Sequence, residues 1–302
     1  MPDDTVIGLV SGGCLEADLA ERARSVRATG EPVRVRYDAT ADEDIVWGLG
    51  LGCAGVVDVL LEPITRNRPG PLAALARVVR TGVAEVIATV IEPGVQLGDR
   101  VAVPPEAGAR ALELGRPQHA TIGPLEILVE PLLPPTQLLV LGAGPDVGPV
   151  VRTAAALGWD VTVWDHRPAF ARAERLPEAR SVVCCPVEDA PERLAVDRTT
   201  AALVMTHHYL HDRALLDWLL PSPAWYVGVL GPKQRTVDLL ADLGSEGVVP
   251  SEPERARLYG PAGLDIGAEG PEEIALALLG EIRAVQADRR GGLLRDRKGP
   301  IH

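Results

Sequence analysis

The stretch LLVLGAGPDVGPVVRTAAALGWDVTVWD, residues 138–165, decides the fold of the larger half of this chain. Its pattern predicts a buried strand, a glycine-containing turn, a helix and a second strand. Gly142 ends the first strand, Gly144 would let the backbone approach a phosphate, and Asp165 closes the second strand. The stretch therefore predicts a βαβ unit of the dinucleotide-binding type.

The glycine spacing in this turn leaves the ligand open. The glycines follow G-x-G-x-x-x-G, whereas the common dinucleotide fingerprint is G-x-G-x-x-G. Backbone amides of Gly142, Ala143 and Gly144 at a helix start favour a phosphate or pyrophosphate. The alternative is a tight turn that only makes the fold and binds nothing.

Downstream of this stretch the same alternation continues through residues 137–287, which we predict to form one domain. We expect strands over 137–143, 159–165, 181–185, 200–208 and 224–231, and helices over 146–158, 168–176, 187–195, 212–220, 234–244 and 270–290. Short apolar runs separated by helical segments are typical of a parallel sheet covered by helices on both faces. The fold class is therefore α/β, with a Rossmann-like domain.

The region before it, residues 1–131, is less regular and predicts a smaller α+β domain. We expect strands over 5–10, 33–38, 55–63, 85–93, 100–103 and 125–131, and helices over 15–28, 70–81 and 105–113. Residues 132–136 contain paired prolines, which interrupt helices and central strands and so predict a linker. Residues 288–302 mix cations with Asp and predict a polar tail.

Composition excludes several classes of function. The net charge of −12 argues against a nucleic-acid-binding surface, which depends on clustered Lys and Arg. No apolar run is long enough to span a membrane, and the start MPDDTV lacks the features of a signal peptide. Four cysteines in 302 residues do not make a disulfide framework. We therefore expect a cytoplasmic protein that binds neither nucleic acid nor membrane.

Two cysteines and two histidines stand at positions where ligands bind. Cys14 in SGGCLE and Cys53 in GLGLGCAGVV are each flanked by glycine, which favours an accessible thiol, although single cysteines are more often small core residues. His207 and His208 follow a buried strand at its carboxyl end, where α/β sheets bind ligands. They could bind a metal, transfer protons or only form hydrogen bonds.

Seven segments together resemble the XdhC/CoxI family, the accessory factors for xanthine dehydrogenase and related molybdenum hydroxylases. They are VSGGCLE, LGLGCAGVVDVLLEP, LLVLGAGPD, LGWDVTVWDHRP, VMTHHYLHD, YVGVLGPKQR and GLDIGAEGPEEIALALLGEI, and they occur in this order over nearly the whole chain. The resemblance implies an amino-terminal XdhC/CoxI domain followed by a Rossmann-like domain, often in dimers.

The resemblance also implies a function. It implies a maturation factor that binds molybdenum cofactor (molybdopterin) as cargo and protects it while it is sulfurated. The factor then delivers it to an apo molybdenum hydroxylase of the xanthine or CO dehydrogenase type, with a cysteine desulfurase as second partner. Carried onto this chain, the two cysteine motifs and the glycine loop fall on Ser11, Gly12, Gly13, Cys14, Gly52, Cys53, Gly142, Ala143 and Gly144. A molybdenum centre favours soft thiolates, so Cys53 is the predicted metal contact.

Two features depart from the family pattern. Family members carry several dozen residues before SGGC, whereas this motif begins at Ser11, so we expect an amino-terminal domain shortened relative to the family. Leu9 also replaces a serine that is usual before the motif, which removes one hydroxyl donor.

A competing hypothesis is an NAD(P)-dependent oxidoreductase. It would use the Gly142 loop for the pyrophosphate, Asp165 for the ribose and His207 or His208 as acid and base. The atypical glycine spacing speaks against it. We therefore predict a cofactor-binding chaperone without turnover of its own.

Overall fold

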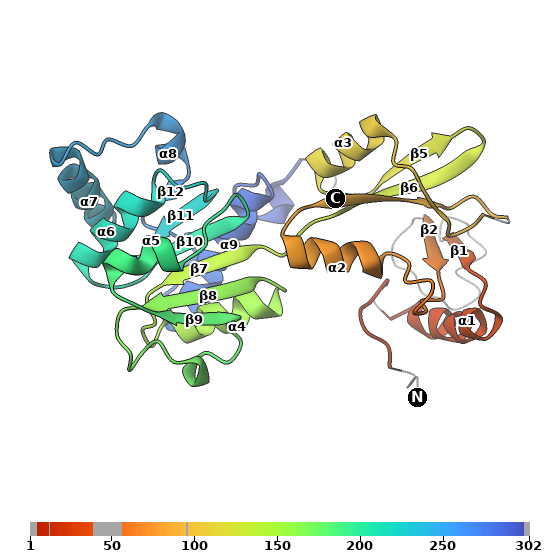
Figure 1. Cartoon of the computed structure of the whole chain (residues 1–302), viewed down its shortest axis with the longest axis horizontal. Helices are drawn as coiled ribbons and strands as arrows, with labels where there is room; N and C mark the ends of the chain where they lie inside the picture. Colours follow the sequence, from red (N-terminus) through yellow and green to blue (C-terminus); the bar gives the residue numbers. More distant parts are fainter. Residues whose placement is uncertain (1–4, 12, 39–55, 95, 299–302) are drawn as a thin grey trace. The chain divides into compact units, whose positions relative to one another are not determined.

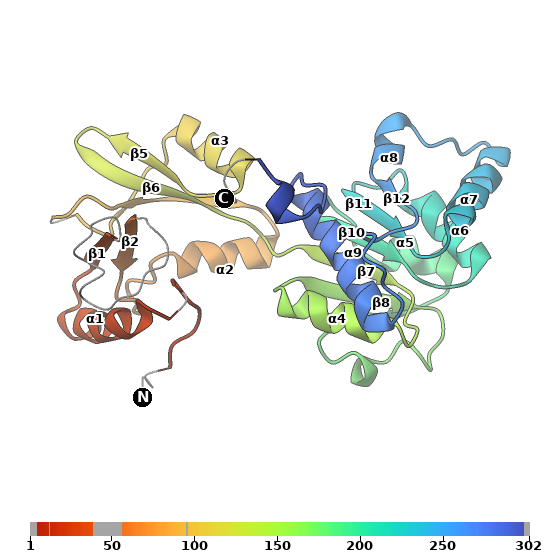
Figure 2. The same ribbon diagram turned by 180° about the vertical axis from the view of Figure 1, so that it is seen from behind.

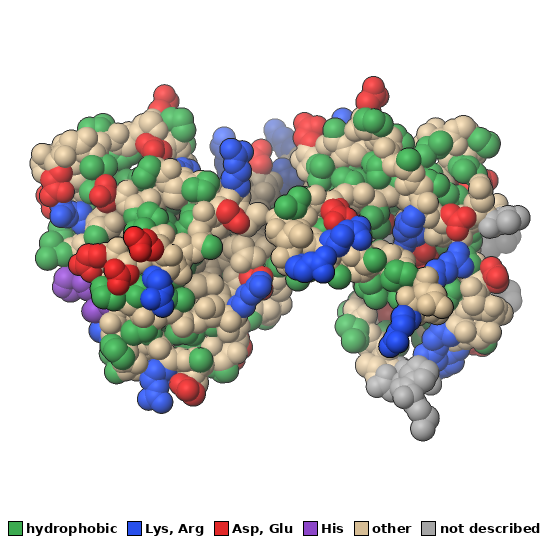
Figure 3. Space-filling view, viewed as in Figure 1, with side chains coloured by type: hydrophobic (Ala, Val, Ile, Leu, Met, Phe, Trp, Pro, Cys, Tyr) green, Lys and Arg blue, Asp and Glu red, His purple; other side chains and the backbone are tan. Residues whose placement is uncertain are grey.

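The computed structural model describes residues 5–11, 13–38, 56–94 and 96–298. The chain divides into two compact units, Met1–Pro134 and Pro135–His302 (Figure 1). No helix in the described ranges is long and apolar enough to cross a membrane. On the face drawn in Figure 3, both cationic and anionic side chains are present on each unit.

The carboxy-terminal unit is built on one sheet whose neighbouring strands are all parallel. Its strands are β7 (Gln137–Leu141), β8 (Asp160–Asp165), β9 (Ser181–Cys184), β10 (Thr200–Val204), β11 (Tyr226–Val229) and β12 (Leu258–Tyr259). They lie in the order β12-β11-β10-β7-β8-β9. Renumbered from β7, this is the doubly wound order 6-5-4-1-2-3, which confirms the predicted α/β class.

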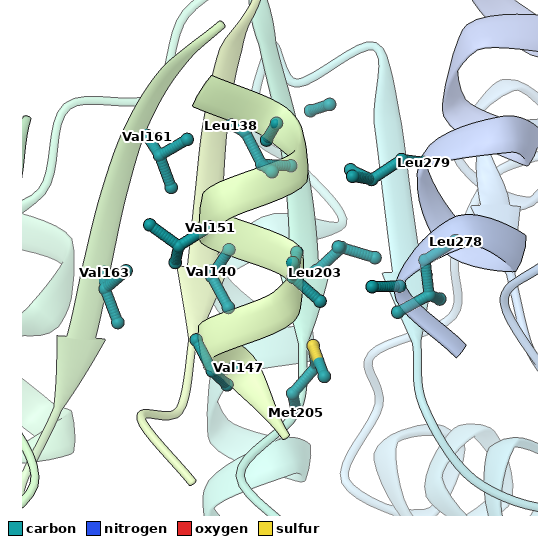
Figure 4. Packing of buried hydrophobic residues seen from close by; sticks show 14 of the residues in the cluster. Leu138, Val140, Val147, Val151, Val161, Val163, Leu203, Met205, Leu278 and Leu279 are labelled. Atoms are coloured by element: carbon teal, nitrogen blue, oxygen red, sulfur yellow. The ribbon is translucent and has the colours of Figure 1, made fainter. Parts of the chain in front are cut away.

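Helices cover both faces of this sheet (Figures 1 and 2). They are α4 (Val147–Ala156), α5 (Ala190–Arg193), α6 (Tyr209–Leu219), α7 (Lys233–Ser245), α8 (Glu252–Ala256) and α9 (Pro271–Gln286). Along β7, Leu138 and Val140 pack in one core with α4 and α9, whereas Leu139 and Leu141 pack in the other with α6 and α7. Because alternate side chains of a strand point to opposite faces, a strand covered on both sides is apolar throughout. Figure 4 shows the first of these cores.

The point where the chain changes direction in the sheet lies between β7 and β10. The chain leaves β7 toward β8 on one side and returns later to β10 on the other. In open α/β sheets this point opens a crevice beyond the carboxyl ends of the strands, where ligands bind. The glycine loop follows β7 and His207 follows β10, so the fold brings these two predicted features together.

In its described residues, the amino-terminal unit combines two antiparallel sheets with three helices. Strands β1 (Val33–Asp38) and β2 (Val56–Leu61) form one pair, and β4 (Arg100–Val101), β3 (Glu85–Val90), β6 (Leu125–Leu132) and β5 (Gln118–Ile122) follow one another in the second sheet. The helices are α1 (Glu16–Thr29), α2 (Leu72–Thr81) and α3 (Pro105–Leu114). Ala88, Val90, Ala111, Ile127 and Val129 form its buried centre. This α+β arrangement agrees with the prediction.

Several predicted elements are wrong. Residues 5–10 form no strand, and Ile7 is 94% exposed, because no described strand lies beside this apolar run. The helix predicted over 168–176 is only a short 3₁₀ turn, Ala173–Arg175, where Arg167 lies 4.0 Å from the ring centre of Phe170. The polar edge strand β5, the two-residue β12 and the short α8 were not predicted, since each is too short or too polar to give a periodic signal.

Candidate functional site

The loop after β7 approaches the end of β10 so closely that only glycine fits at its first position. Gly142 has a φ of +123°, and a Cβ there would lie 2.4 Å from the carbonyl oxygen of Met205. The Gly142 amide donates to the carbonyl of Trp164 at 2.7 Å. The loop is therefore held against both neighbouring strands at the switch point.

Asp165 accepts a hydrogen bond from this loop, and its side chain is almost completely buried from solvent. Its carboxylate accepts from the Ala143 amide at 2.7 Å, from the Arg167 amide at 2.9 Å and from the Arg167 guanidinium at 2.9 and 2.7 Å. Burial raises the pKa of Asp165, but the hydrogen bonds from Arg167 and Ala143 outweigh burial and bring the pKa below its ordinary value. Both carboxylate oxygens are thus occupied by the loop and by Arg167.

A second carboxylate lies over the glycine loop. A Cβ on Gly144 would lie 2.5 Å from Oδ1 of Asp146, and Oδ2 of Asp146 is 2.9 Å from Nε2 of His207. His207 itself has a left-handed backbone with φ of +56°, which is uncommon for a residue with a side chain. Asp146 therefore brings a negative charge next to Gly144, and His207 contacts the same carboxylate.

Three further histidines meet beside this crevice. The ring of His211 lies 4.3 Å from the ring of His166 and 4.1 Å from that of His208, measured between centres. Burial and these two neighbours lower the pKa of His211. His208 begins α6, and its Nδ1 accepts from the His211 amide at 3.4 Å. Within the described ranges no three His, Cys, Asp or Glu residues are arranged to hold a metal ion.

A largely buried ion pair lies beyond the carboxyl end of β10. Asp212 is 1% exposed and accepts from the hydroxyl of Thr206 and from Nε of Arg235 at 3.0 Å. These bonds join the end of β10 to α6 and α7. Arg235 is therefore engaged with Asp212, whereas Lys233 in the first turn of α7 is exposed.

In the amino-terminal unit, Ser11, Gly13 and Cys14 lie just before α1. Oε1 of Glu16 accepts from the amides of Val10 and Ser11 at 2.9 and 2.7 Å, and Oε2 accepts from the Ser11 hydroxyl at 2.7 Å. These bonds, led by that of the Ser11 hydroxyl, lower the pKa of Glu16 to about 2. Ser11 thus has a structural role. Gly13 and Cys14 are exposed, and the Cys14 thiol is free.

We predict that Glu16→Gln releases this segment. A neutral amide side chain cannot accept three charge-assisted hydrogen bonds. Hydrogen exchange at the backbone amides of Val10 and Ser11 should therefore accelerate roughly tenfold. In the wild type the fold favours the ionised carboxylate; its contribution is complete above pH 4.5 and is lost as the pH falls toward 2. Glu21→Gln, on the exposed side of the same helix, is the control. Equal exchange rates in both variants would contradict the assignment.

The predicted site residues separate into three groups. Gly142, Ala143, Gly144, Asp165, His207 and His208 meet at the switch point, whereas Ser11, Gly13 and Cys14 belong to the amino-terminal unit. Gly12, Gly52 and Cys53, including the predicted metal contact, lie outside the described residues. Asp146, His166 and Asp212 were not predicted. All three lie inside segments that carry the family resemblance, but their roles depend on contacts that only the fold creates.

Comparison with known proteins places this chain. Residues 138–282 match the model of the XdhC Rossmann domain, and residues 1–38 match that of the XdhC and CoxI family. A Bacillus subtilis protein named as a probable subunit of xanthine dehydrogenase is 31% identical over 91% of this chain and 83% of its own. The chain belongs to the XdhC/CoxI family.

Two other proteins extend the comparison. A crystal structure described as a xanthine dehydrogenase from Bacillus halodurans has a TM-score of 0.76 and 30% identity, covering 95% of this chain and 84% of its own. An Escherichia coli protein named molybdenum cofactor insertion chaperone PaoD is 24% identical over 94% of this chain and 76% of its own. The family predicted from the sequence motifs is confirmed.

Proposed function

We propose that this XdhC/CoxI protein binds molybdenum cofactor as cargo, protects it during sulfuration and delivers it to an apo molybdenum hydroxylase. The observation that supports the proposal is the similarity, over almost the whole chain, to a relative named as a molybdenum cofactor insertion chaperone. The cysteine desulfurase that would supply sulfur, the choice between xanthine and CO dehydrogenase types, the cytoplasmic location and a homodimer belong to the same proposal.

The crevice geometry favours a carrier over a dinucleotide oxidoreductase. An oxidoreductase of this fold would use a carboxylate at the end of the second strand to bind the ribose. Asp165 stands at that position, but it accepts hydrogen bonds from Ala143 and Arg167 and is 1% exposed. NAD(P) binding therefore lacks its usual acidic contact, and the Gly144 amide is the remaining feature suited to a phosphate.

Insertion of active cofactor is the experiment that tests the proposal. Purified molybdenum cofactor is exposed to air with or without this protein and then mixed with an apo molybdenum hydroxylase, whose recovered activity is measured. The proposal expects recovered activity to survive air exposure only when the protein is present. Equal loss with the protein and with serum albumin would reject protection and delivery.

Asp146 provides a sharper test of the glycine loop. A phosphate reaching Gly144 must displace the Asp146 carboxylate, whose negative charge opposes it. We therefore expect Asp146→Asn to tighten retention of the cofactor by about threefold to tenfold, within the 0.5–1.5 kcal/mol range of a hydrogen bond. Asp189→Asn makes the same charge change at an exposed site and should have no effect. Weaker or unchanged retention in Asp146→Asn would place the phosphate elsewhere.

A further inference from the structure

The segment after α9, residues 288–298, presents two leucines to solvent; we call it the tail segment. Leu293 and Leu294 are 61% and 64% exposed, although leucine is among the residues most often buried. A Cβ on Gly291 would lie 2.6 Å from Cδ2 of Leu264, so the start of the tail segment packs against the loop before α9. The segment therefore holds two large apolar side chains away from its own core.

The tail segment is also cationic, in contrast to the rest of the chain. The whole chain has a net charge of −12. Cations outnumber carboxylates in the tail segment by five to two: Arg289, Arg290, Arg295, Arg297 and Lys298 against Asp288 and Asp296. Such a segment is attracted to an acidic surface, and its exposed leucines require an apolar one.

A groove of about 340 Å³ lies on the carboxy-terminal unit, where the loops after α5 and α6 meet; we call it the Trp218 groove. Its apolar lining residues are Pro191, Leu194, Val196, Trp218, Pro221 and Pro223. The remaining lining residue is Ser222, whose hydroxyl donates to the Leu219 carbonyl at 2.7 Å. Ligand pockets begin at roughly 300 Å³, so the groove has room for one or two aliphatic side chains.

Carboxylates outnumber cations beside the Trp218 groove. Glu192, Asp197 and Asp217 each directly adjoin a lining residue in the sequence, and all three are exposed. Among these sequence neighbours, all of which the structure describes, Arg193 is the one cation. The groove is therefore apolar inside and acidic at its edge, which complements the leucines and arginines of the tail segment.

The tail segment cannot reach the groove of its own copy. The Leu264 amide donates to the Ala277 carbonyl of α9, whereas the groove lies by α5 and α6 on the opposite face of the sheet (Figures 1 and 2). Leu294 follows Gly291 by three residues and so reaches at most about 11 Å from it. Helices on opposite faces of a sheet lie about 20 Å apart, because neighbouring layers pack about 10 Å apart. The leucines that fit this groove must therefore come from another chain.

We infer that Leu293 and Leu294 of one copy dock in the Trp218 groove of a second copy, with the tail arginines facing the acidic edge. The inference rests only on the homodimer within the proposed function, for which it names the contacting surfaces, and does not depend on the cofactor. The contact joins two different surfaces, so two copies that exchange tail segments form a closed pair.

The test uses a fluorescein-labelled peptide of residues 288–298, whose fluorescence anisotropy is followed while full-length protein is added. We expect saturable binding. The peptide that carries Leu293→Ser and Leu294→Ser should bind about tenfold or more weakly, because serine cannot replace the apolar surface that the groove buries. Both changes are in the peptide, so the fold of the protein is not disturbed.

Charge reversal at the edge of the groove tests the second part of the contact. Glu192→Lys combined with Asp217→Lys, both at exposed positions, should weaken peptide binding about threefold to tenfold. The peptide with Arg289→Glu and Arg290→Glu should bind this variant more tightly than it binds the wild type.

A matched control makes the same charge change away from the groove. Glu178→Lys combined with Glu252→Lys lies at exposed positions outside the lining and should bind the unchanged peptide like the wild type. No saturable peptide binding, equal binding of the serine peptide, or equal effects of the two charge-reversed proteins would overturn the inference.

Self-association of the full chain separates this inference from the proposed function. In sedimentation equilibrium without cofactor, Leu293→Ser combined with Leu294→Ser should associate about tenfold or more weakly than the wild type. If this variant pairs as strongly as the wild type, the homodimer stands and the surface assignment fails. If the tail segment binds the groove but cofactor is not retained, the surface assignment stands and the carrier function fails.

Discussion

Gly142→Ala is expected to lower the free energy of unfolding of the carboxy-terminal unit by at least about 3 kcal/mol, because an added Cβ would overlap backbone. The new atom would lie 2.4 Å from the Met205 carbonyl oxygen and 2.7 Å from its carbon, and φ at this position is +123°. Neither the end of β10 nor the loop can move without breaking a strand hydrogen bond. The midpoint of thermal unfolding should fall by about 6–12 °C.

Gly158→Ala is the matched control for this variant. Gly158 also has a positive φ, +76°, but a Cβ there would meet no atom within 4 Å. Gly158→Ala should therefore lower the free energy of unfolding only by the cost of a left-handed backbone at alanine, about 1–2 kcal/mol. Comparable destabilisation by the two substitutions would show that Gly142 is required for its φ alone and that the close approach to β10 is unimportant.

Asp165→Asn is expected to destabilise the same unit by about 2–4 kcal/mol, because a neutral amide cannot replace a buried carboxylate. The Ala143 amide and the Arg167 guanidinium would each lose a charged acceptor, although Arg167, 38% exposed, can recover some hydration. Urea unfolding followed by circular dichroism measures the loss. Asp189→Asn, at an exposed site, should change the free energy of unfolding by less than about 0.5 kcal/mol.

The pH dependence of this difference identifies its cause. Since the pKa of Asp165 lies below its ordinary 3.8 in the fold, the ionised group contributes its full stabilisation above that pH. As the pH falls below 3.8 the wild type should lose this advantage and approach Asp165→Asn. A difference that is independent of pH would indicate a packing defect.

The sequence predicted the carboxy-terminal unit well because its signals are local. The strands β7, β10 and β11 are nearly continuous apolar runs, and Gly142 marks the first turn. In α9, apolar residues at helical spacing are buried at Leu278 and Ile282 and partly buried at Ile274. Periodicity of this kind requires no knowledge of distant contacts.

The sequence predicted less of the crevice because its geometry depends on neighbours that are distant along the chain. Asp165 occupies the position of a ribose ligand, yet the bonds from Ala143 and Arg167 that occupy it exist only after β7 and β8 pair. Asp146 belongs to the segment LLVLGAGPD, but its contact with His207, 61 residues away, exists only in the folded chain. Residues 5–10 were wrongly predicted as a strand because a stable strand needs a neighbouring strand to pair with as well as apolar side chains.

The measurement that tests the central claim most directly is co-elution of intact molybdenum cofactor with the purified chain on gel filtration under nitrogen. The pterin and molybdenum in the protein peak are quantified after denaturation, with serum albumin as a control. We predict that pterin and molybdenum elute with the protein, in a fixed molar ratio to the protein and to each other. Elution of all the pterin and molybdenum at the position of free cofactor would contradict it.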